Sequence, residues 1–250
     1  MINYVVIIPA RYESSRLPGK PLIDLCGLPM VVRTYQQCLK AFPMERVYVA
    51  TDDIRIHETC KNYQIQTIMT SSECLTGTDR VAECANQLDA DIFLNVQGDE
   101  PVFNPSDLKS LLRAVECFPN DILNGYCVLD QEAMFRSGNI PKVVMRSDGR
   151  LLYMSRAAIP STKEHGFKAA FRQVCAYAFP KAALNDFAKQ SQKTPLETIE
   201  DIEILRFLEL GWEVRMIQMS NVSVAVDTYE DIKRAEAAIQ FLETRNERFF

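Results

Sequence analysis

The chain has 250 residues, of which 47% are hydrophobic and 24% charged, and its formal net charge is -5. This length allows one large α/β unit or two small domains, and the acidic balance excludes a general nucleic-acid binder, which needs many cations on one face. No apolar stretch approaches the ~20 residues of a membrane-spanning helix, and no signal peptide is recognisable, so we expect a cytoplasmic protein that does not contact membranes.

The first half alternates between apolar runs and helical patterns. Residues 5–8 form a continuous apolar run without alternation, which is typical of a parallel strand covered on both faces. Along the chain there follow a helical pattern at 30–39, strand candidates at 46–50 and 65–69, a helical pattern at 78–88, and a strand candidate at 91–96. This order predicts an α/β fold with a doubly wound, mostly parallel sheet.

The second half predicts shorter strands, at 122–129, 143–146, 151–154 and 173–179, and then helices at 197–210 and 228–243. Such a mix favours an antiparallel extension of the first sheet that closes one side of a site. No linker rich in Gly, Ser or Pro interrupts the chain, so we expect residues 1–250 to form a single domain.

The loop after the first predicted strand is cationic. It holds Arg11, Arg16 and Lys20, with a turn at Pro18-Gly19. It is not a P-loop, because the upstream glycine is missing and Pro21 stands where a Ser or Thr would hold magnesium. Such a loop suits phosphate oxygens, although a solvated surface loop with incidental charges is the alternative.

Two acidic residues follow later apolar runs. Asp99 lies in "NVQGDEP", in the turn after the 91–96 run, where a carboxylate can hold Mg²⁺ against a polyphosphate. Asp227, in "VAVDTYED", could be a second ligand, whereas Asp231 occupies a capping-box position of the last helix. The alternative for both motifs is an ordinary turn or helix-capping role.

A further motif, "TGTDR", covers residues 76–80. Thr78 could cap a helix after Gly77, which leaves Arg80 in the first turn, where a cation opposes the helix dipole. Such a cation needs an external anion or a polar partner, so Arg80 is a candidate nucleotide contact; a plain surface residue is the alternative.

With these motifs in hand, the chain resembles the 3-deoxy-manno-octulosonate cytidylyltransferases, or CMP-Kdo synthetases. The matching stretches occur in family order over essentially the whole length: "VVIIPARYESSRLPGKPL", "VYVATDD", "LTGTDRVAE", "NVQGDEP", "LLYMSRAAIP", "TPLETIE" and "VAVDTYED". The resemblance implies a nucleotidyltransferase that uses CTP and Mg²⁺ to activate a sugar acid for lipopolysaccharide synthesis, usually as a homodimer.

The resemblance also implies roles for particular residues. Lys20, Asp99 and Asp227 would be catalytic, and the two aspartates would hold Mg²⁺. The implied nucleotide contacts are Ala10, Arg11, Arg16, Lys20, Gly77 and Arg80. The implied sugar contacts are Gln97, Arg156, Tyr177 and Glu197, joined by the neighbouring Gln173, Thr198 and Asp201. Arg156 suits the sugar carboxylate, because a guanidinium pairs with it through two hydrogen bonds.

The chain departs from the family pattern beside the expected sugar contacts. Gln173 and Thr198 stand where the family usually has His, and Asp201 adds a carboxylate. A pocket that loses potential cations and gains an anion suits a positively charged substrate, so we hypothesise the amino sugar 8-amino-3,8-dideoxy-manno-octulosonate (Kdo8N). Neutral drift is the alternative.

Two other functions compete with this one. One is a cytidylyltransferase for another acidic sugar, and the other is a non-catalytic nucleotide-binding module. A Rossmann-type dehydrogenase is disfavoured, because G-x-G-x-x-G is missing after the first strand.

Overall fold

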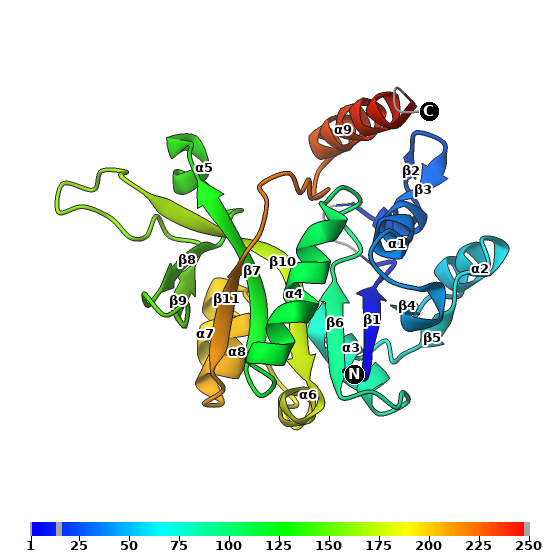
Figure 1. Cartoon of the computed structure of the whole chain (residues 1–250), viewed down its shortest axis with the longest axis horizontal. Coiled ribbons are helices and arrows are strands. Elements are labelled where there is room, and N and C mark those ends of the chain that lie inside the picture. The colour runs from blue at the N-terminus through cyan, green and yellow to red at the C-terminus, as the bar shows by residue number, and fades with distance from the viewer. Residues whose placement is uncertain (1, 14–16, 248–250) are drawn as a thin grey trace.

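The structure, a computed structural model, describes residues 2–13 and 17–247 (Figure 1). Within these residues the main sheet has nine strands, and its central path runs β11-β7-β10-β6-β1-β4-β5. β1 (Tyr4–Pro9) pairs in parallel with β4 (Val47–Thr51) and β6 (Ile92–Val96), and β4 pairs in parallel with β5 (Thr67–Met69). The predicted parallel, doubly wound half is therefore confirmed.

Two hydrophobic clusters fill the two faces of this sheet. On one face Val6 and Ile8 pack with α1, α2 and α4, and on the other Val5 and Ile7 pack with α3, α6 and α8. Burial on both faces explains why β1 is apolar at consecutive positions. The bounds of these helices are α1 (Met30–Leu39), α2 (Ile54–Asn62), α3 (Gly77–Ala85), α4 (Pro105–Cys117), α6 (Lys181–Ala188) and α8 (Ile204–Glu209).

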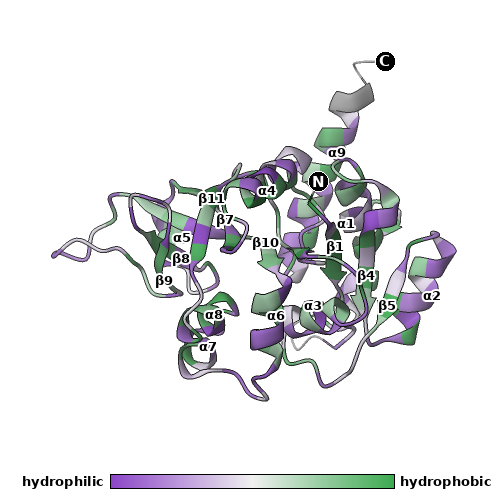
Figure 2. Cartoon of the chain, turned by 60° about the horizontal axis from the view of Figure 1, so that its bottom comes forward, coloured by the Kyte–Doolittle hydropathy of each residue, from purple (hydrophilic) through white to green (hydrophobic). Residues whose placement is uncertain are grey.

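Hydropathy follows this layering. In Figure 2 the central strands β1 and β4 are green, whereas α2 at the edge is largely purple. Of the nine residues of α2, only Ile56 and Cys60 are buried. Every helix in the described ranges is too short or too polar to cross a bilayer.

The second half extends the sheet, mostly in antiparallel fashion as predicted. β10 (Ala170–Pro180) pairs antiparallel with both β6 and β7 (Ile122–Leu129), while β11 (Val214–Gln218) pairs in parallel with β7. The hairpin of β8 (Lys142–Met145) and β9 (Leu151–Ser155) joins β10 near α5 (Glu132–Arg136), at the left of Figure 1. That residues 1–250 form a single domain stays a prediction.

The helix predicted at 197–210 is two helices in the structure. α7 (Pro195–Glu200) ends at Asp201, whose φ of 51° is left-handed, and α8 begins at Ile204. A left-handed residue cannot continue a right-handed helix, so the chain turns here.

The C-terminal segment packs on the N-terminal one. α9 (Tyr229–Glu247) lies beside the hairpin of β2 (Asp24–Leu25) and β3 (Leu28–Pro29). A third hydrophobic cluster joins Val226, Ala235 and Ile239 to Leu17 and Leu25. This packing brings the residue after Val226 close to the short 3₁₀ helix η1 (Lys20–Leu22); the other such helix is η2 (Met44–Arg46).

Candidate active site

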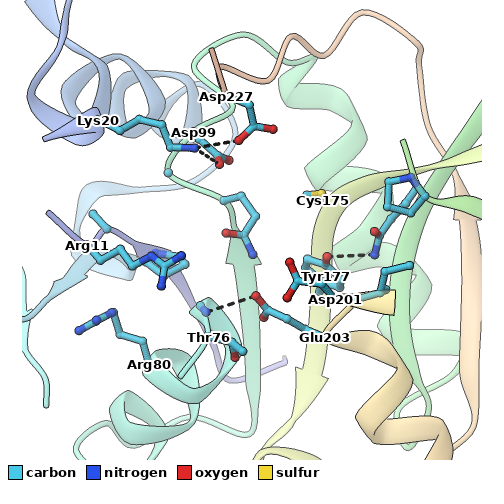
Figure 3. Close-up of a pocket in the computed structure, with 18 of the residues that line it drawn as sticks. Arg11, Lys20, Thr76, Arg80, Asp99, Cys175, Tyr177, Asp201, Glu203 and Asp227 are labelled. Atoms are coloured by element: carbon cyan, nitrogen blue, oxygen red, sulfur yellow. Dashed lines mark hydrogen bonds and ion pairs between the residues drawn. The ribbon is translucent and has the colours of Figure 1, made fainter. Parts of the chain in front are cut away.

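A pocket of about 310 Å³ opens at the carboxyl ends of β1 and β6, where ligands of doubly wound sheets bind. Its walls come from the loops after these strands, the start of α3, β10, and the turn between α7 and α8. Figure 3 shows the side chain of Arg11 on one side of it and those of Tyr177 and Glu203 on the other, whereas the guanidinium of Arg80 points away from these two residues.

Lys20, Asp99 and Asp227 meet at one end of the pocket. The Lys20 Nζ lies 2.7 Å from an Asp99 oxygen and 3.2 Å from an Asp227 oxygen (Figure 3). Burial by itself lowers the pKa of Lys20, but its attraction and hydrogen bonds to both carboxylates outweigh burial, so the pKa lies above 10.5. Three residues that are far apart in the sequence thus form one charged cluster.

Backbone bonds hold this cluster in place. Gly19 adopts a φ of +69°, and its N–H donates to the Tyr12 carbonyl before the chain enters η1. The Val226 N–H donates to the Asp99 carbonyl at 2.9 Å, which fixes the approach of Asp227.

The predicted nucleotide contacts line the pocket where the structure describes them. These are Ala10, Arg11, Lys20, Gly77 and Arg80. Arg16 lies outside the described residues.

Arg80 has an internal partner that the sequence did not reveal. Its guanidinium lies 3.2 Å from the Asp52 carboxylate and also donates to the Thr70 hydroxyl. Asp52 and Thr70 are therefore the polar partners that a cation in the first turn of α3 needs. The predicted cap is also corrected, because Thr76, and not Thr78, accepts from the Asp79 N–H at the start of α3.

Five predicted sugar contacts line the pocket, namely Gln97, Arg156, Gln173, Tyr177 and Asp201. The Arg156 guanidinium donates to the backbone carbonyls of Glu200, Gly138 and Asp201, at 2.6, 3.1 and 2.9 Å. These hydrogen bonds connect the segment at Gly138 to the end of α7 at the rim of the pocket.

Asp201 is paired in the structure. A hydrogen bond from Lys193, 2.7 Å away, lowers the pKa of the Asp201 carboxyl. Lys193 also lines the pocket, so the rim carries both charges.

The expected sugar contacts of Glu197 and Thr198 are not supported by their positions. Glu197 is fully buried, and Arg206 binds its two carboxylate oxygens at 2.6 and 2.8 Å. Thr198 is exposed on α7, and neither residue lines the pocket. The physical reason is the ion pair, which turns the Glu197 side chain towards α8.

Sequence reasoning missed Glu203, a pocket carboxylate. It accepts hydrogen bonds from the Gly77 and Thr78 N–H groups at 3.3 and 2.8 Å and from the Thr78 hydroxyl at 2.5 Å. Burial raises the pKa of Glu203, while the bonds from Thr78 act in the opposite direction. A carboxylate at a helix N-terminus is stabilised by the dipole, but here the helix is distant in sequence, so no local signal marks the contact.

Comparison with known proteins adds to this geometry. A family model described as cytidylyltransferase matches residues 5–232. The chain is 37% identical to the 3-deoxy-manno-octulosonate cytidylyltransferase of Protochlamydia amoebophila, covering 92% of each chain. It is 34% identical to the 8-amino-3,8-dideoxy-manno-octulosonate cytidylyltransferase of Shewanella halifaxensis, covering 95% of this chain and 99% of that one.

A solved structure is also similar. It is that of CMP:2-keto-3-deoxy-manno-octonic acid synthetase complexed with CTP, which is 31% identical to this chain. The match has a TM-score of 0.88 and covers 95% of this chain and 98% of the other.

Proposed function

The chain belongs to the cytidylyltransferase family, as a nucleotidyltransferase similar to the CMP-Kdo synthetases, and from this we propose that it converts CTP and 3-deoxy-manno-octulosonate to the CMP-sugar and diphosphate. The observation that carries the proposal is the cluster of Lys20, Asp99 and Asp227 at one end of the pocket. A cation and two carboxylates at the carboxyl ends of the strands suit a triphosphate with its counter-ion.

The reaction needs positioning more than a protein nucleophile. The anomeric hydroxyl of the sugar attacks the α-phosphorus of CTP and forms a new O–P bond, its proton passes to solvent water, and diphosphate leaves with the electron pair of the broken P–O bond. Arg11 and Lys20 bind and orient the triphosphate, because both are cations in the loop after β1 and attract its negative charge. Arg80 also lines the pocket, and Asp52 holds its guanidinium in place.

Asp99 and Asp227 fit a magnesium ion. Both approach one cation, the Lys20 ammonium, so their oxygens already point at a common position. Two carboxylates would occupy only part of the octahedral coordination sphere of Mg²⁺, so the ion would take its other oxygens from the substrate and water. When bound, the ion would neutralise phosphate charge and lower the pKa of the attacking hydroxyl.

We further propose that Kdo8N is the preferred sugar. Thr198 no longer supports this, because it does not line the pocket. The support comes from Gln173, uncharged where the family usually has His, and from the pocket carboxylate of Glu203; Asp201 is paired with Lys193 and adds no net charge. The Shewanella halifaxensis relative is named for this sugar, although the similarity to the Protochlamydia amoebophila relative, named for Kdo, is of the same order.

The test is diphosphate release from CTP with Kdo, Kdo8N and a nine-carbon sialic-type acid, run with and without Mg²⁺. We expect the highest kcat/KM for Kdo8N. Equal or faster turnover of Kdo would remove the amino-sugar preference and leave the cytidylyltransferase. Turnover of the nine-carbon acid alone would favour another sugar, and CTP binding without turnover of any acid would favour a non-catalytic module.

The homodimer is part of the same proposal. Light scattering coupled to size exclusion is the measurement, and a mass near 28.5 kDa would contradict it.

A further inference from the structure

We propose that Asn124, a residue outside the pocket, is a positioning residue for Gln173. Asn124 orients the Gln173 carboxamide so that its oxygen faces the sugar, and this oxygen accepts a hydrogen bond from the sugar's amino group. This inference rests on the proposed function and specifies the hydrogen-bonding character of one wall of the pocket. Asn124 lies on β7, is fully buried, and does not line the pocket.

Two backbone carbonyls determine the orientation of Asn124. Its Nδ2 donates to the carbonyls of Val174 and Ala176, at 3.0 and 3.1 Å. These carbonyls lie where β10 shifts its register against β7, between Val174 and Tyr177. A carbonyl can only accept, so the amide group of Asn124 must face them and its Oδ1 must point away.

The same argument applies to Gln173, whose exposed fraction is only 7%. Its Nε2 lies 3.0 Å from the Asn124 Oδ1 and 3.0 Å from the Tyr177 hydroxyl (the bond drawn at Tyr177 in Figure 3). The Asn124 oxygen can only accept, so Gln173 must present its NH₂ group there. Both N–H groups of that nitrogen are then used.

The remaining polar atom of Gln173 is its Oε1, which has no partner within residues 2–13 and 17–247. It is not one of the fully buried unpartnered side-chain atoms of these residues, so solvent reaches it. Because Gln173 lines the pocket, we infer that Oε1 is accessible from the pocket.

An acceptor held in this way selects a donor. Rotating the carboxamide would set the Gln173 oxygen against the Asn124 oxygen, which is unfavourable in a buried site. Gln173 therefore offers the sugar an oxygen, in the same pocket as the Glu203 carboxylate. A protonated amine forms a stronger hydrogen bond to such an acceptor than a neutral hydroxyl does.

The test measures the selectivity ratio, which is kcat/KM for Kdo8N divided by kcat/KM for Kdo. Gln173→Met removes the acceptor at similar size and should lower the ratio about tenfold. Asn124→Ala frees the carboxamide and should lower the ratio about threefold or more. Val128→Ala, at an exposed position of the same strand, is the control and should leave the ratio unchanged.

The double variant distinguishes positioning from general damage. If Asn124 acts through Gln173, the variant with both substitutions should have the same ratio as Gln173→Met alone. An unchanged ratio in Asn124→Ala, or effects that multiply, would overturn the proposal. Circular dichroism and CTP affinity check folding, and Asn124→Ser, which cannot reach both carbonyls, replaces Asn124→Ala if that variant does not fold.

Failure of this inference differs from failure of the function. Wild-type protein that releases no diphosphate with either sugar contradicts the proposed function. Wild-type protein that uses Kdo but not Kdo8N contradicts the amino-sugar preference and the role of Gln173 argued here, and leaves the cytidylyltransferase activity in place.

Discussion

Arg206→Met should destabilise the protein strongly, because it leaves the buried carboxylate of Glu197 without its cation. Arg206 is fully buried, binds both oxygens of the buried Glu197, and lies 2.8 Å from an Asp79 oxygen. Its guanidinium also stacks 3.7 Å from the centre of the Phe187 ring. Met keeps the apolar stem, so the loss is mainly electrostatic.

The expected loss is about 3–5 kcal/mol of the free energy of unfolding, the usual cost of removing one partner from a buried pair. Urea unfolding followed by circular dichroism measures it. The control is Lys189→Met, which removes an exposed pair with Asp186 and should cost less than about 1 kcal/mol.

A second variant tests the cause. Replacing both Glu197 and Arg206 by Met removes the uncompensated charge and should recover part of the stability, because apolar side chains of similar volume can replace a buried pair. A loss below about 1 kcal/mol for Arg206→Met would refute the reasoning, since Glu197 would then tolerate burial without a cation.

Three further changes follow from the site. Lys20→Met should lower kcat/KM for CTP about 100-fold or more in the diphosphate assay, while Lys61→Met, at an exposed pair on α2, should not change it. Gly98→Ala would bring a Cβ within 2.7 Å of the Pro9 carbonyl oxygen and should lower the free energy of unfolding by about 1–3 kcal/mol; Gly138→Ala, with nothing within 4 Å, should have little effect. Burial acts to raise the pKa of Asp231, but hydrogen bonds from Asp227 and Thr228 outweigh it and lower the pKa below 3.8. The stability that Asp231 adds is therefore present above pH 3.8 and is lost as the pH falls through the lowered pKa. The free energies of unfolding of wild type and Asp231→Asn should differ at pH 6, and the difference should shrink as the pH falls below 3.8; a constant difference would contradict this.

The strands of the first half could be predicted because their cause is local. β1 is buried on both faces, and the consecutive apolar residues record this directly. The helix α2 was missed because its buried face holds only two residues, Ile56 and Cys60, which is too short a pattern to recognise in the sequence. The break between α7 and α8 was missed because Asp201 adopts a left-handed conformation. Aspartate can adopt this conformation, but its presence in a sequence does not predict it.

The same distinction separates the site residues that converge from those that do not. Lys20, Asp99 and Asp227 meet although 79 and 207 residues separate Lys20 from the two aspartates, because the loops after parallel strands gather at one edge of the sheet. That topological rule lets a sequence pattern predict a contact between distant segments. The rule does not predict contacts of side chains on the helices that cover the sheet.

No comparable rule applies to Glu197, which faces α8 and not the pocket. A carboxylate in the first turn of a helix has a capping role wherever the helix lies, so its position in the motif does not say which neighbour it contacts. The deciding residue is Arg206, whose burial depends on how α8 packs against α3 and α6. A side chain at the end of a sheet strand can be assigned to a site from topology, whereas one on a covering helix depends on packing that the sequence pattern does not encode.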